Sequence, residues 1–343
     1  MTNPRVALVG YGMAGQQFHL PLLLAAGVPP AVIATGSPER AARARADVPG
    51  VAVVPDLDAA LATDPGLVVL ASPTGVHRDQ ALTCVAAGVA VVVDKPLAVD
   101  AAGARAVTDA AEAAGVPLTV FQNRRWDPEN LALAGVLARG DLGRVYRFER
   151  RWERWRPVPK DRWRERLSAQ DGGGVLLDLG PHLVDSAVRF FGPVTSVYAE
   201  LAARTTAAED DVFLSLRHES GVRSHLTAGS LVGAPGPRTR VLGDRGAYVV
   251  TRFEDDDPAF TTGAEDGEGH CGWIIAGPSR RAVPRGTGEP ADFYRAVAAA
   301  LALPDPVARR AAMPVDPRDA VATAGVLDAA RVSAAEGRTV TLA

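Results

Sequence analysis

The chain has 343 residues, of which 47% are hydrophobic and 22% are charged, and its formal net charge is −3. This length predicts two domains, and the near-neutral charge argues against a general attraction to nucleic acid or to a membrane surface. Only Cys84 and Cys271 occur, which excludes a disulfide framework and a four-cysteine zinc site. The sequence shows neither a signal-peptide pattern nor an apolar run of membrane-spanning length, and we expect a cytoplasmic location.

The first third of the sequence alternates short apolar runs with alanine-rich segments. The apolar runs lie at residues 5–10, 31–35, 51–54, 67–71, 89–93 and 118–121. Segments between them, such as HRDQALTCVAAG, end at glycine, as helices often do. Strands that are apolar throughout and alternate with helices predict an α/β domain whose parallel sheet is covered on both faces.

The segment GYGMAG, residues 10–15, follows the first apolar run and opens a predicted helix. Gly10, Gly12 and Gly15 fit the G-x-G-x-x-G pattern in the strand–turn–helix context that a dinucleotide site requires. Gly10 permits the tight turn, Gly12 lets the backbone approach a pyrophosphate, and Gly15 allows close packing of helix and strand. A purely structural glycine-rich turn is the alternative, but the context favours a dinucleotide.

The end of the second predicted strand distinguishes NADP from NAD. An acidic residue about 20 positions after the glycine pattern binds the ribose 2′-hydroxyl of NAD. That position is Thr35, and the next acidic residue is Glu39, already in the following helix. Ser37 and Arg40 stand where a 2′-phosphate would be held. The sequence therefore favours NADP(H), with NAD as the alternative and with Arg40 otherwise an exposed helix residue.

After Phe121 the rhythm changes, so residues 1–121 are expected to form the nucleotide-binding domain and residues 122–343 the second domain. A helix is expected over about 127–139 and a charged strand near 144–151. Four segments with strand character then follow closely, which favours a mixed or antiparallel sheet in an α+β domain. These segments are VTSVYAELAAR, DVFLSLRH, VRSHLTAGSL and RTRVLGDRGAYVV.

The last ninety residues predict a loop and two helices. Residues 254–288 are rich in Gly, Pro and Asp, a composition typical of a long loop. The helices are expected near 290–302 and 317–335.

The segment DLGPHLVD carries three polar side chains at helical spacing. Asp178, His182 and Asp185 are four and three positions apart, which places them on one face of a helix. Two carboxylates and an imidazole are costly to bury unless they meet water, a partner or a substrate. The structural alternative is that Asp178 caps the helix and His182 makes an internal hydrogen bond.

Lysine is rare in this chain. Of 37 basic residues only Lys95 and Lys160 are lysines, and the other 35 are arginines. Lysine can give up its proton in a protein and arginine cannot. Lys95 directly follows the fifth apolar run, at the carboxyl end of a parallel strand where ligands bind. This position favours proton transfer by Lys95, with chance as the alternative.

Residues 144–166 hold nine arginines and three tryptophans, a composition that invites comparison with nucleic-acid-binding segments. Four acidic residues and two prolines interrupt the segment, so we expect a strand followed by a loop near the active site. Trp163 and Arg164 are candidate substrate contacts, and so are Asn123, Arg125 and Trp126. The density of arginine leaves a phosphorylated or carboxylated sugar open.

The motifs together resemble the glucose–fructose oxidoreductase/inositol dehydrogenase (Gfo/Idh/MocA) superfamily. They are VALVGYGMAG, SPTGVHRDQA, VDKPLAVD, FQNRRWD and GGGVLLDLGPHLVD. The run GYGMAGQQFH looks most like the scyllo-inositol dehydrogenase branch, which is typically NADP-linked. The resemblance implies a Rossmann domain followed by a domain with a large open sheet that mediates homodimers or homotetramers.

The resemblance also implies a set of site residues. Lys95, Asp178 and His182 form the catalytic group. The cofactor contacts are expected at Gly10, Gly12, Met13, Ala14, Gly15, Thr35, Ser37, Arg40, Pro73, Thr74, His77, Asp94, Lys95 and Pro96. Relatives carry Glu-Lys-Pro where this chain has Asp94, and their Lys–Pro bond is often cis.

We therefore expect an oxidoreductase that transfers a hydride between NADP(H) and a secondary carbinol or ketone of a sugar, a cyclitol or a derivative, without a metal ion. Lys95 would polarise and protonate the substrate oxygen, His182 would donate or accept a proton, and Asp178 would orient the imidazole or bind a hydroxyl. The alternative is a noncatalytic NADP-binding sensor or regulatory protein. Such a protein would bind the cofactor but need no proton donor at position 95 or 182.

Overall fold

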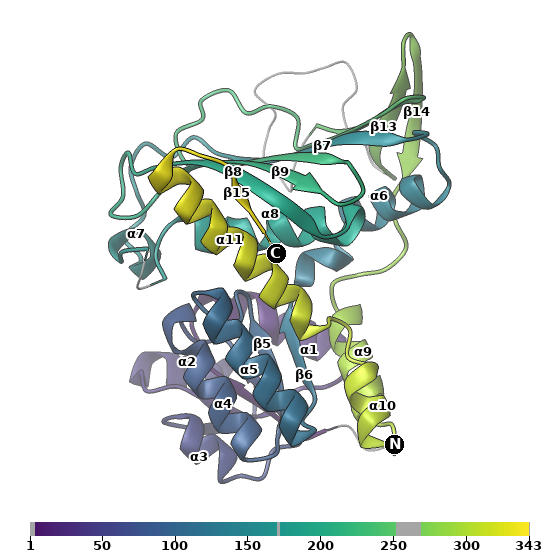
Figure 1. Ribbon diagram of the computed structural model, residues 1–343. Helices are drawn as coiled ribbons and strands as arrows, with labels where there is room; N and C mark the ends of the chain where they lie inside the picture. The colour runs from purple at the N-terminus through teal and green to yellow at the C-terminus, as the bar shows by residue number, and fades with distance from the viewer. Residues whose placement is uncertain (1–3, 170–171, 252–268, 343) are drawn as a thin grey trace. The chain divides into compact units, whose positions relative to one another are not determined.

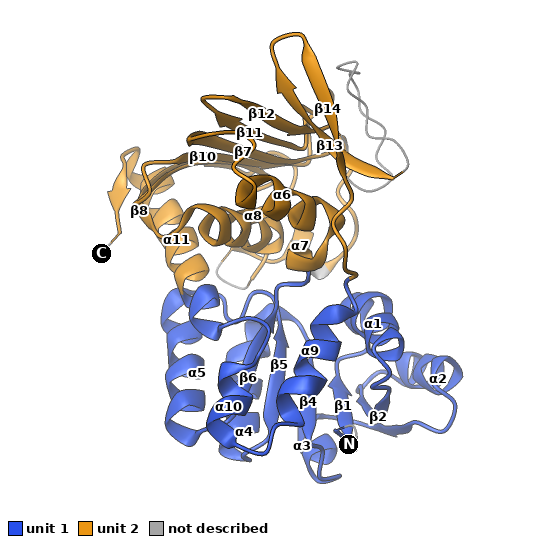
Figure 2. Ribbon diagram, turned by 90° about the vertical axis from the view of Figure 1, so that its right-hand side faces the viewer, with its two compact units in different colours: residues 1–123, 290–321 blue, residues 124–289, 322–343 orange. Residues whose placement is uncertain are grey.

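The computed structural model describes residues 4–169, 172–251 and 269–342, except for the side chains of residues 163 and 164 (Figure 1). The chain divides into two compact units, coloured separately in Figure 2. Unit 1 comprises Met1–Asn123 and Pro290–Val321, and unit 2 comprises Arg124–Glu289 and Ala322–Ala343. The sequence predicted one domain boundary, between residues 121 and 122. In the structure, residues 290–321 also belong to unit 1.

Unit 1 is built on a six-stranded parallel sheet with the strand order β3-β2-β1-β4-β5-β6. This is the Rossmann arrangement that the alternating pattern predicts. The strands are β1 (Val6–Val9), β2 (Pro30–Ala34), β3 (Ala52–Val54), β4 (Leu67–Leu70), β5 (Ala90–Asp94) and β6 (Leu118–Phe121). Every residue of β1, β4, β5 and β6 is buried, because helices cover both faces of the sheet.

The helices of unit 1 connect these strands. They are η1 (Ala14–His19), α1 (Leu20–Ala25), α2 (Pro38–Asp47), α3 (Leu57–Leu61), η2 (Thr74–Val76), α4 (His77–Ala86), α5 (Ala101–Ala114), α9 (Asp292–Leu301) and α10 (Pro306–Ala311). Helix α9 holds residues 290–321 in this unit, because Phe293 and Tyr294 pack on Phe121 with ring centroids 5.1 and 5.7 Å away. The short helix α10 is absent from the sequence-based expectation.

Unit 2 contains a nine-stranded sheet with the order β14-β13-β12-β11-β7-β10-β9-β8-β15. Among the described strands of this sheet only the β7–β10 pair is parallel, so the sheet is mixed and mostly antiparallel, as expected. The strands are β7 (Val145–Glu153), β8 (Val194–Ala202), β9 (Asp211–His218), β10 (Arg223–Gly229), β11 (Thr239–Gly243), β12 (Gly246–Val250), β13 (His270–Ala276), β14 (Ser279–Pro284) and β15 (Val340–Thr341).

Helices cover one face of this sheet, as Figure 2 shows. These helices are α6 (Pro128–Ala138), α8 (Val175–Phe191) and α11 (Pro317–Glu336). Two short elements precede them in the sequence: the turn η3 (Asn123–Trp126) comes before α6, and the helix α7 (Trp163–Arg166) comes before α8. Leu183 of α8 is fully buried in the core with Leu214 and Leu226 of the sheet. A Cβ on Gly180 would lie 2.9 Å from Leu327 of α11, so glycine permits the close approach of these two helices.

The region expected as one long loop contains a β-hairpin. Strands β13 and β14 pair antiparallel, and the hydroxyl of Tyr248 donates to the carbonyl of Cys271 at 2.7 Å. The loop expectation is therefore wrong for residues 270–284, where the strand character of HCGWIIA outweighs the surrounding glycine and proline. Residues 252–268 lie outside the described residues. Within the parts that the structure describes, no helix is long and apolar enough to cross a membrane.

Candidate functional site

The glycine segment after β1 forms a tight turn that only glycine tolerates at two positions. Gly10 has φ of +95°, and a Cβ there would lie 2.7 Å from the carbonyl of Ala71. A Cβ on Gly15 would lie 2.1 Å from the carbonyl oxygen of Gly10. Gly12 differs, because the nearest atom to a Cβ there is Nη1 of Arg40 at 3.8 Å. The backbone at Gly12 is thus open to close approach by a ligand.

The end of β2 presents no acidic side chain toward this loop. Ser37 caps α2 by accepting a hydrogen bond from the backbone N–H of Arg40 at 3.3 Å. Glu39 instead accepts from Arg43 at 2.6 Å. Nη1 of Arg40 lies 3.8 Å from the position of a Cβ on Gly12, so a cationic group faces the backbone there. A guanidinium at this position is able to bind a phosphate group.

A hydrogen-bond network ties α2 to the glycine segment. Asp47 accepts from the hydroxyl of Tyr11 at 2.6 Å and from the amide of Gln16 at 2.9 Å. Arg43 donates to Gln16 at 3.2 Å. The hydrogen bond from Tyr11 is the main reason that the pKa of Asp47 is lowered. The network fixes the helix that carries Arg40 against the turn that carries Gly12.

A π-helix, Ala14–His19, begins at the end of the glycine segment. The backbone N–H of Leu20 donates to the carbonyl oxygen of Gly15. Such turns are frequent at functional sites. Its last residue, His19, is fully buried, with Nδ1 2.5 Å from the hydroxyl of Tyr294 and Nε2 3.7 Å from Asp94. Sequence reasoning missed this cluster, because 275 residues separate His19 from Tyr294 and no local pattern links them.

Asp94 ends β5, and Lys95 follows it as a half-buried residue. The carboxylate of Asp94 accepts from the backbone N–H of Lys95 at 2.8 Å. Burial alone would raise the pKa of Asp94, but the nearby His19 and the charge of Lys95 lower it to about 2. The carboxyl group is therefore ionised. The Lys95–Pro96 bond is cis, which confirms the expectation from the resemblance.

His77 holds together the two loops that follow β4 and β5. Its Nδ1 lies 2.8 Å from the carbonyl of Pro96, and its Nε2 lies 2.8 Å from the carbonyl of Ser72. Burial lowers the pKa of His77, and the neutral ring can donate to one carbonyl at a time. Thr74 is buried beside it at the start of η2, after Pro73. These loops lie at the carboxyl end of the sheet, where ligands of such folds bind.

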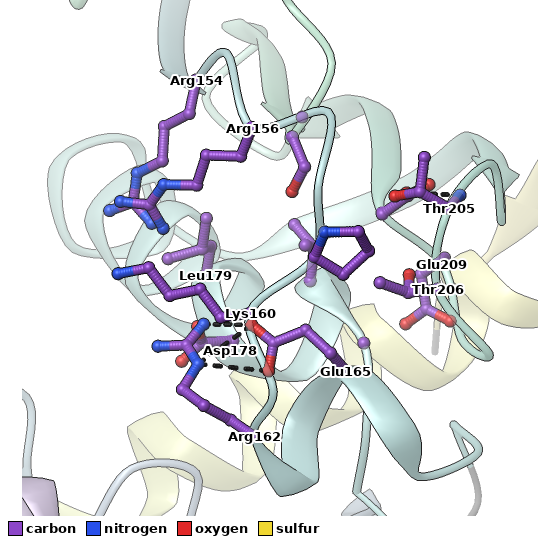
Figure 3. A pocket seen from close by; sticks show the side chains of 16 residues that line it. Arg154, Arg156, Lys160, Arg162, Glu165, Asp178, Leu179, Thr205, Thr206 and Glu209 are labelled. Carbon is purple, nitrogen blue, oxygen red and sulfur yellow. Dashed lines mark hydrogen bonds and ion pairs between the residues drawn. The ribbon is translucent and has the colours of Figure 1, made fainter.

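In unit 2, Asp178 and His182 lie one turn apart on α8, as predicted. Asp178 is half-buried and lines a pocket at the N-terminal end of the helix (Figure 3). His182 is 9% exposed, and its ring lies 5.6 Å from that of Trp152 in β7. Three guanidinium groups surround Trp152 at 4.6–5.2 Å from its ring centroid. They belong to Arg124, Arg154 and Arg238.

Glu129 anchors this cluster of aromatic and cationic groups. It is 8% exposed and lies 2.6 Å from Arg150 and 3.4 Å from Arg238, and it also accepts a hydrogen bond from Thr239. Burial opposes the ionised form, but the charges of Arg150 and Arg238 lower the pKa of Glu129 to about 2. Glu129 thereby holds the Arg238 side chain over Trp152, which packs against His182.

The remaining predicted substrate contacts lie in different surroundings. Arg125 donates to both oxygens of Asp185 at 2.5 and 2.9 Å, so these two residues form a buried ion pair. Asn123 and Trp126 are half-buried in η3. The side chains of Trp163 and Arg164 lie outside the described part of the chain. Within the described residues, no group of three His, Cys, Asp or Glu side chains is arranged to hold a metal ion.

Comparisons with known proteins agree with this architecture. Residues 4–122 match the family model of the oxidoreductase family with an NAD-binding Rossmann fold, and residues 131–249 match the GFO/IDH/MocA C-terminal domain. The oxidoreductase YdgJ of Escherichia coli K12 is 40% identical over 264 residues, which cover 76% of this chain and 75% of YdgJ.

Two further proteins match over nearly the whole length. The scyllo-inositol 2-dehydrogenase (NADP(+)) IolW of Bacillus subtilis 168 is 28% identical over 98% of this chain and 96% of its own. The structure of the oxidoreductase yvaA from Bacillus subtilis has a TM-score of 0.83 at 29% identity, covering 99% of this chain and 98% of that one. The chain therefore belongs to the Gfo/Idh/MocA family of NAD(P)-binding oxidoreductases.

Proposed function

We propose that this protein is an NADP(H)-dependent oxidoreductase that transfers a hydride between nicotinamide and a secondary carbinol or ketone of a sugar, a cyclitol or a derivative. The observation that carries the cofactor choice is the guanidinium of Arg40 over Gly12, together with the pairing of Glu39 to Arg43. The similarity to IolW, whose name includes NADP(+) and scyllo-inositol, supports both the cofactor and the substrate class.

The glycine turn fits a dinucleotide, because Gly12 leaves space for a pyrophosphate that a side chain would fill. In this proposal Ser37 and Arg40 hold the 2′-phosphate, with Thr35 beside them. Bound NADP(H) supplies or accepts the hydride. The other cofactor contacts are proposed at Met13, Ala14, Pro73, Thr74, His77, Asp94 and Pro96.

Lys95 and His182 handle the proton that must accompany hydride transfer. Lys95 donates a proton to the substrate oxygen during reduction and removes it during oxidation, and Asp94 restrains its backbone. His182 is proposed to exchange a proton with the substrate, and its ring is in contact with Trp152. Asp178, one helical turn earlier, binds a substrate hydroxyl. Asn123 and Trp126 are proposed as further substrate contacts.

We also propose that the nine-stranded sheet mediates a homodimer or homotetramer. Helices α6, α8 and α11 cover one face of the sheet. Alternate residues of β9, such as Phe213, Ser215 and Arg217, are more exposed than their buried neighbours. They therefore face away from the helical layer. Sedimentation analysis of the purified protein would show a monomer if this proposal were wrong.

The cofactor proposal is tested by titrating the protein with NADPH and with NADH. We expect tighter binding of NADPH, and Arg40→Ala should narrow the difference by about 10-fold or more, since a hydrogen bond to a charged group contributes roughly 1.5–3 kcal/mol. Arg45→Ala, on an exposed position of the same helix, serves as the control. Equal binding of the two cofactors by the wild type would overturn the proposal.

Activity is tested with a panel of inositols, hexoses and nucleotide sugars, followed by absorbance of the reduced nicotinamide. Turnover of at least one polyol is the expected result. Tight NADPH binding with no turnover of any compound would instead favour a noncatalytic NADP-binding sensor.

A further inference from the structure

The pocket of unit 2 lies where the segment after β7 meets the N-terminal end of α8 and the loop before β9 (Figure 3). The pocket is open to solvent, and its volume is about 600 Å³ when the open space at its entrance is included. Asp178, proposed above as a substrate contact, contributes to its lining.

Four cationic side chains gather on one side of the pocket. They are Arg154, Arg156, Lys160 and Arg162, as Figure 3 shows. Arg162 forms an ion pair with Glu165, whereas neither Arg156 nor Lys160 makes an ion pair within the described residues. Cationic groups that face a pocket without a protein counter-charge favour an anionic ligand.

The opposite side of the pocket presents oxygen atoms instead of cations, from Thr205, Thr206 and Glu209 (Figure 3). Glu209 is 8% exposed, and its Oε1 is buried without a hydrogen-bond partner among the described residues. A buried polar atom of this kind costs free energy until a ligand group satisfies it. Burial raises the pKa of Glu209.

Asp210 also lines the pocket, but its carboxylate has a structural role. It accepts hydrogen bonds from the backbone N–H groups of Arg204 and Thr205 at 2.7 and 2.8 Å, and from the hydroxyl of Thr205 at 2.6 Å. These bonds fix the loop that carries Glu209. With Glu165 and Asp210 engaged, one side of the pocket presents Arg156 and Lys160 with the carboxylate of Asp178 beside them, and the other side presents the oxygens of Thr205, Thr206 and Glu209.

We infer that this pocket binds an anionic polyol, a sugar acid or a sugar phosphate, with its acidic group against Arg156 and Lys160 and its hydroxyls against Asp178 and Glu209. The inference rests on the proposed function, because it makes the anionic polyol the substrate. Arginine binds a carboxylate or a phosphate through two parallel hydrogen bonds, and lysine adds a point charge. A neutral cyclitol would leave both cations without a counter-charge.

The test compares hexoses and inositols with their carboxylate and phosphate counterparts, for instance D-glucose with D-glucuronate and D-glucose 6-phosphate. Binding to the NADP⁺-loaded protein is measured by calorimetry. At least one anionic compound should bind about 10-fold or more tightly than its neutral parent, as hydrogen bonds to charged groups imply. If the carboxylates bind more tightly than the phosphates, the acidic group of the ligand is a carboxylate, and the reverse order indicates a phosphate. The inference is overturned if no anionic compound binds better than its neutral parent.

Variants locate the effect in the pocket. Arg156→Gln/Lys160→Gln should remove the preference for the anion while the binding of neutral compounds and of NADP⁺ changes less than about twofold. The control is Arg45→Gln/Arg105→Gln, which removes two positive charges from exposed positions of α2 and α5. Thermal melts verify that both variants fold. A preference that survives in the pocket variant, or falls equally in the control, contradicts the inference.

Turnover of the same compounds separates this inference from the proposed function. A preference for the anion in binding without turnover of any compound contradicts the oxidoreductase proposal and supports the anion site. Equal kcat/KM for neutral and anionic compounds supports the oxidoreductase and contradicts the anion site. If both proposals hold, the pocket variant raises KM for the anionic substrate about 10-fold or more and leaves kcat within about twofold.

Discussion

Glu129→Gln should destabilise unit 2 strongly at neutral pH. The substitution keeps the size of the side chain but removes the negative charge that lies 2.6 Å from Arg150 and 3.4 Å from Arg238. The pKa of Glu129 falls from 4.5 to about 2 in the folded protein. A difference of roughly 2.5 pH units corresponds to about 3 kcal/mol, because one unit is worth about 1.4 kcal/mol. Breaking a buried ion pair by removing one partner independently suggests about 3–5 kcal/mol.

The pH dependence of this effect has a definite sign. Because the folded-state pKa is lowered, the stabilisation is fully present above the unfolded-state pKa and is lost as the pH falls through the folded-state value. The difference in stability between the wild type and Glu129→Gln should therefore be constant near pH 7 and shrink below about pH 4.5. At pH 3 less than about half of it should remain.

Tryptophan fluorescence makes the assay specific for unit 2, since all five tryptophans lie between residues 126 and 273. Urea unfolding is followed at pH 7 and at several values down to pH 3, and the free energy of unfolding is obtained by linear extrapolation. Glu336→Gln is the control, because Glu336 pairs with Arg338 at an exposed site of unit 2 and should change stability by less than about 1 kcal/mol. A Glu129→Gln difference below about 1 kcal/mol at pH 7, or one that stays constant down to pH 3, would refute the reasoning.

Three further predictions concern the proposed catalytic groups and their surroundings. His182→Asn should lower kcat by roughly 100-fold or more while the Kd for NADPH stays nearly unchanged, and turnover like that of the wild type would assign His182 a structural role. Lys95→Arg should lose most of kcat, as Lys95→Ala should, because the guanidinium keeps its proton; an active Lys95→Arg enzyme would contradict proton transfer. Tyr294→Phe removes the hydroxyl beside His19 and should lower the free energy of unfolding by about 1–3 kcal/mol, measured by circular dichroism, whereas an unchanged value would show that this contact contributes nothing.

The fold was predictable where the pattern is local. Each strand of the unit 1 sheet is a short apolar run between helices. The glycine segment predicts the turn after β1. The hairpin of β13 and β14 was not predictable, because the glycines and prolines around its strand-like run indicated a loop. The return of α9 to unit 1 was also not predictable, since it depends on contacts of Phe293 and Tyr294 with Phe121, far away in sequence.

The candidate site shows the same division. The sequence pointed to the positions of Gly10, Gly12, Asp178 and His182, because motif and helical spacing act over a few residues. It could not reveal the stack of Trp152 with His182 or the arginines around it, which come from separate strands and helices. The sequence also did not reveal the buried ion pair of Arg125 with Asp185, because 60 residues separate the two side chains.

Because residues 290–321 belong to unit 1, the ribosome completes the nucleotide-binding unit only after all of residues 124–289 have been made. Until α9 emerges, Phe121 lacks the rings of Phe293 and Tyr294 that bury it. During synthesis the N-terminal domain of a protein usually folds first. This order of folding is unfavourable here, because unit 1 is still incomplete at that stage. An isolated fragment of residues 1–123 would expose this apolar surface and aggregate, whereas a fusion that joins residue 123 to residue 290 through a short linker would restore it.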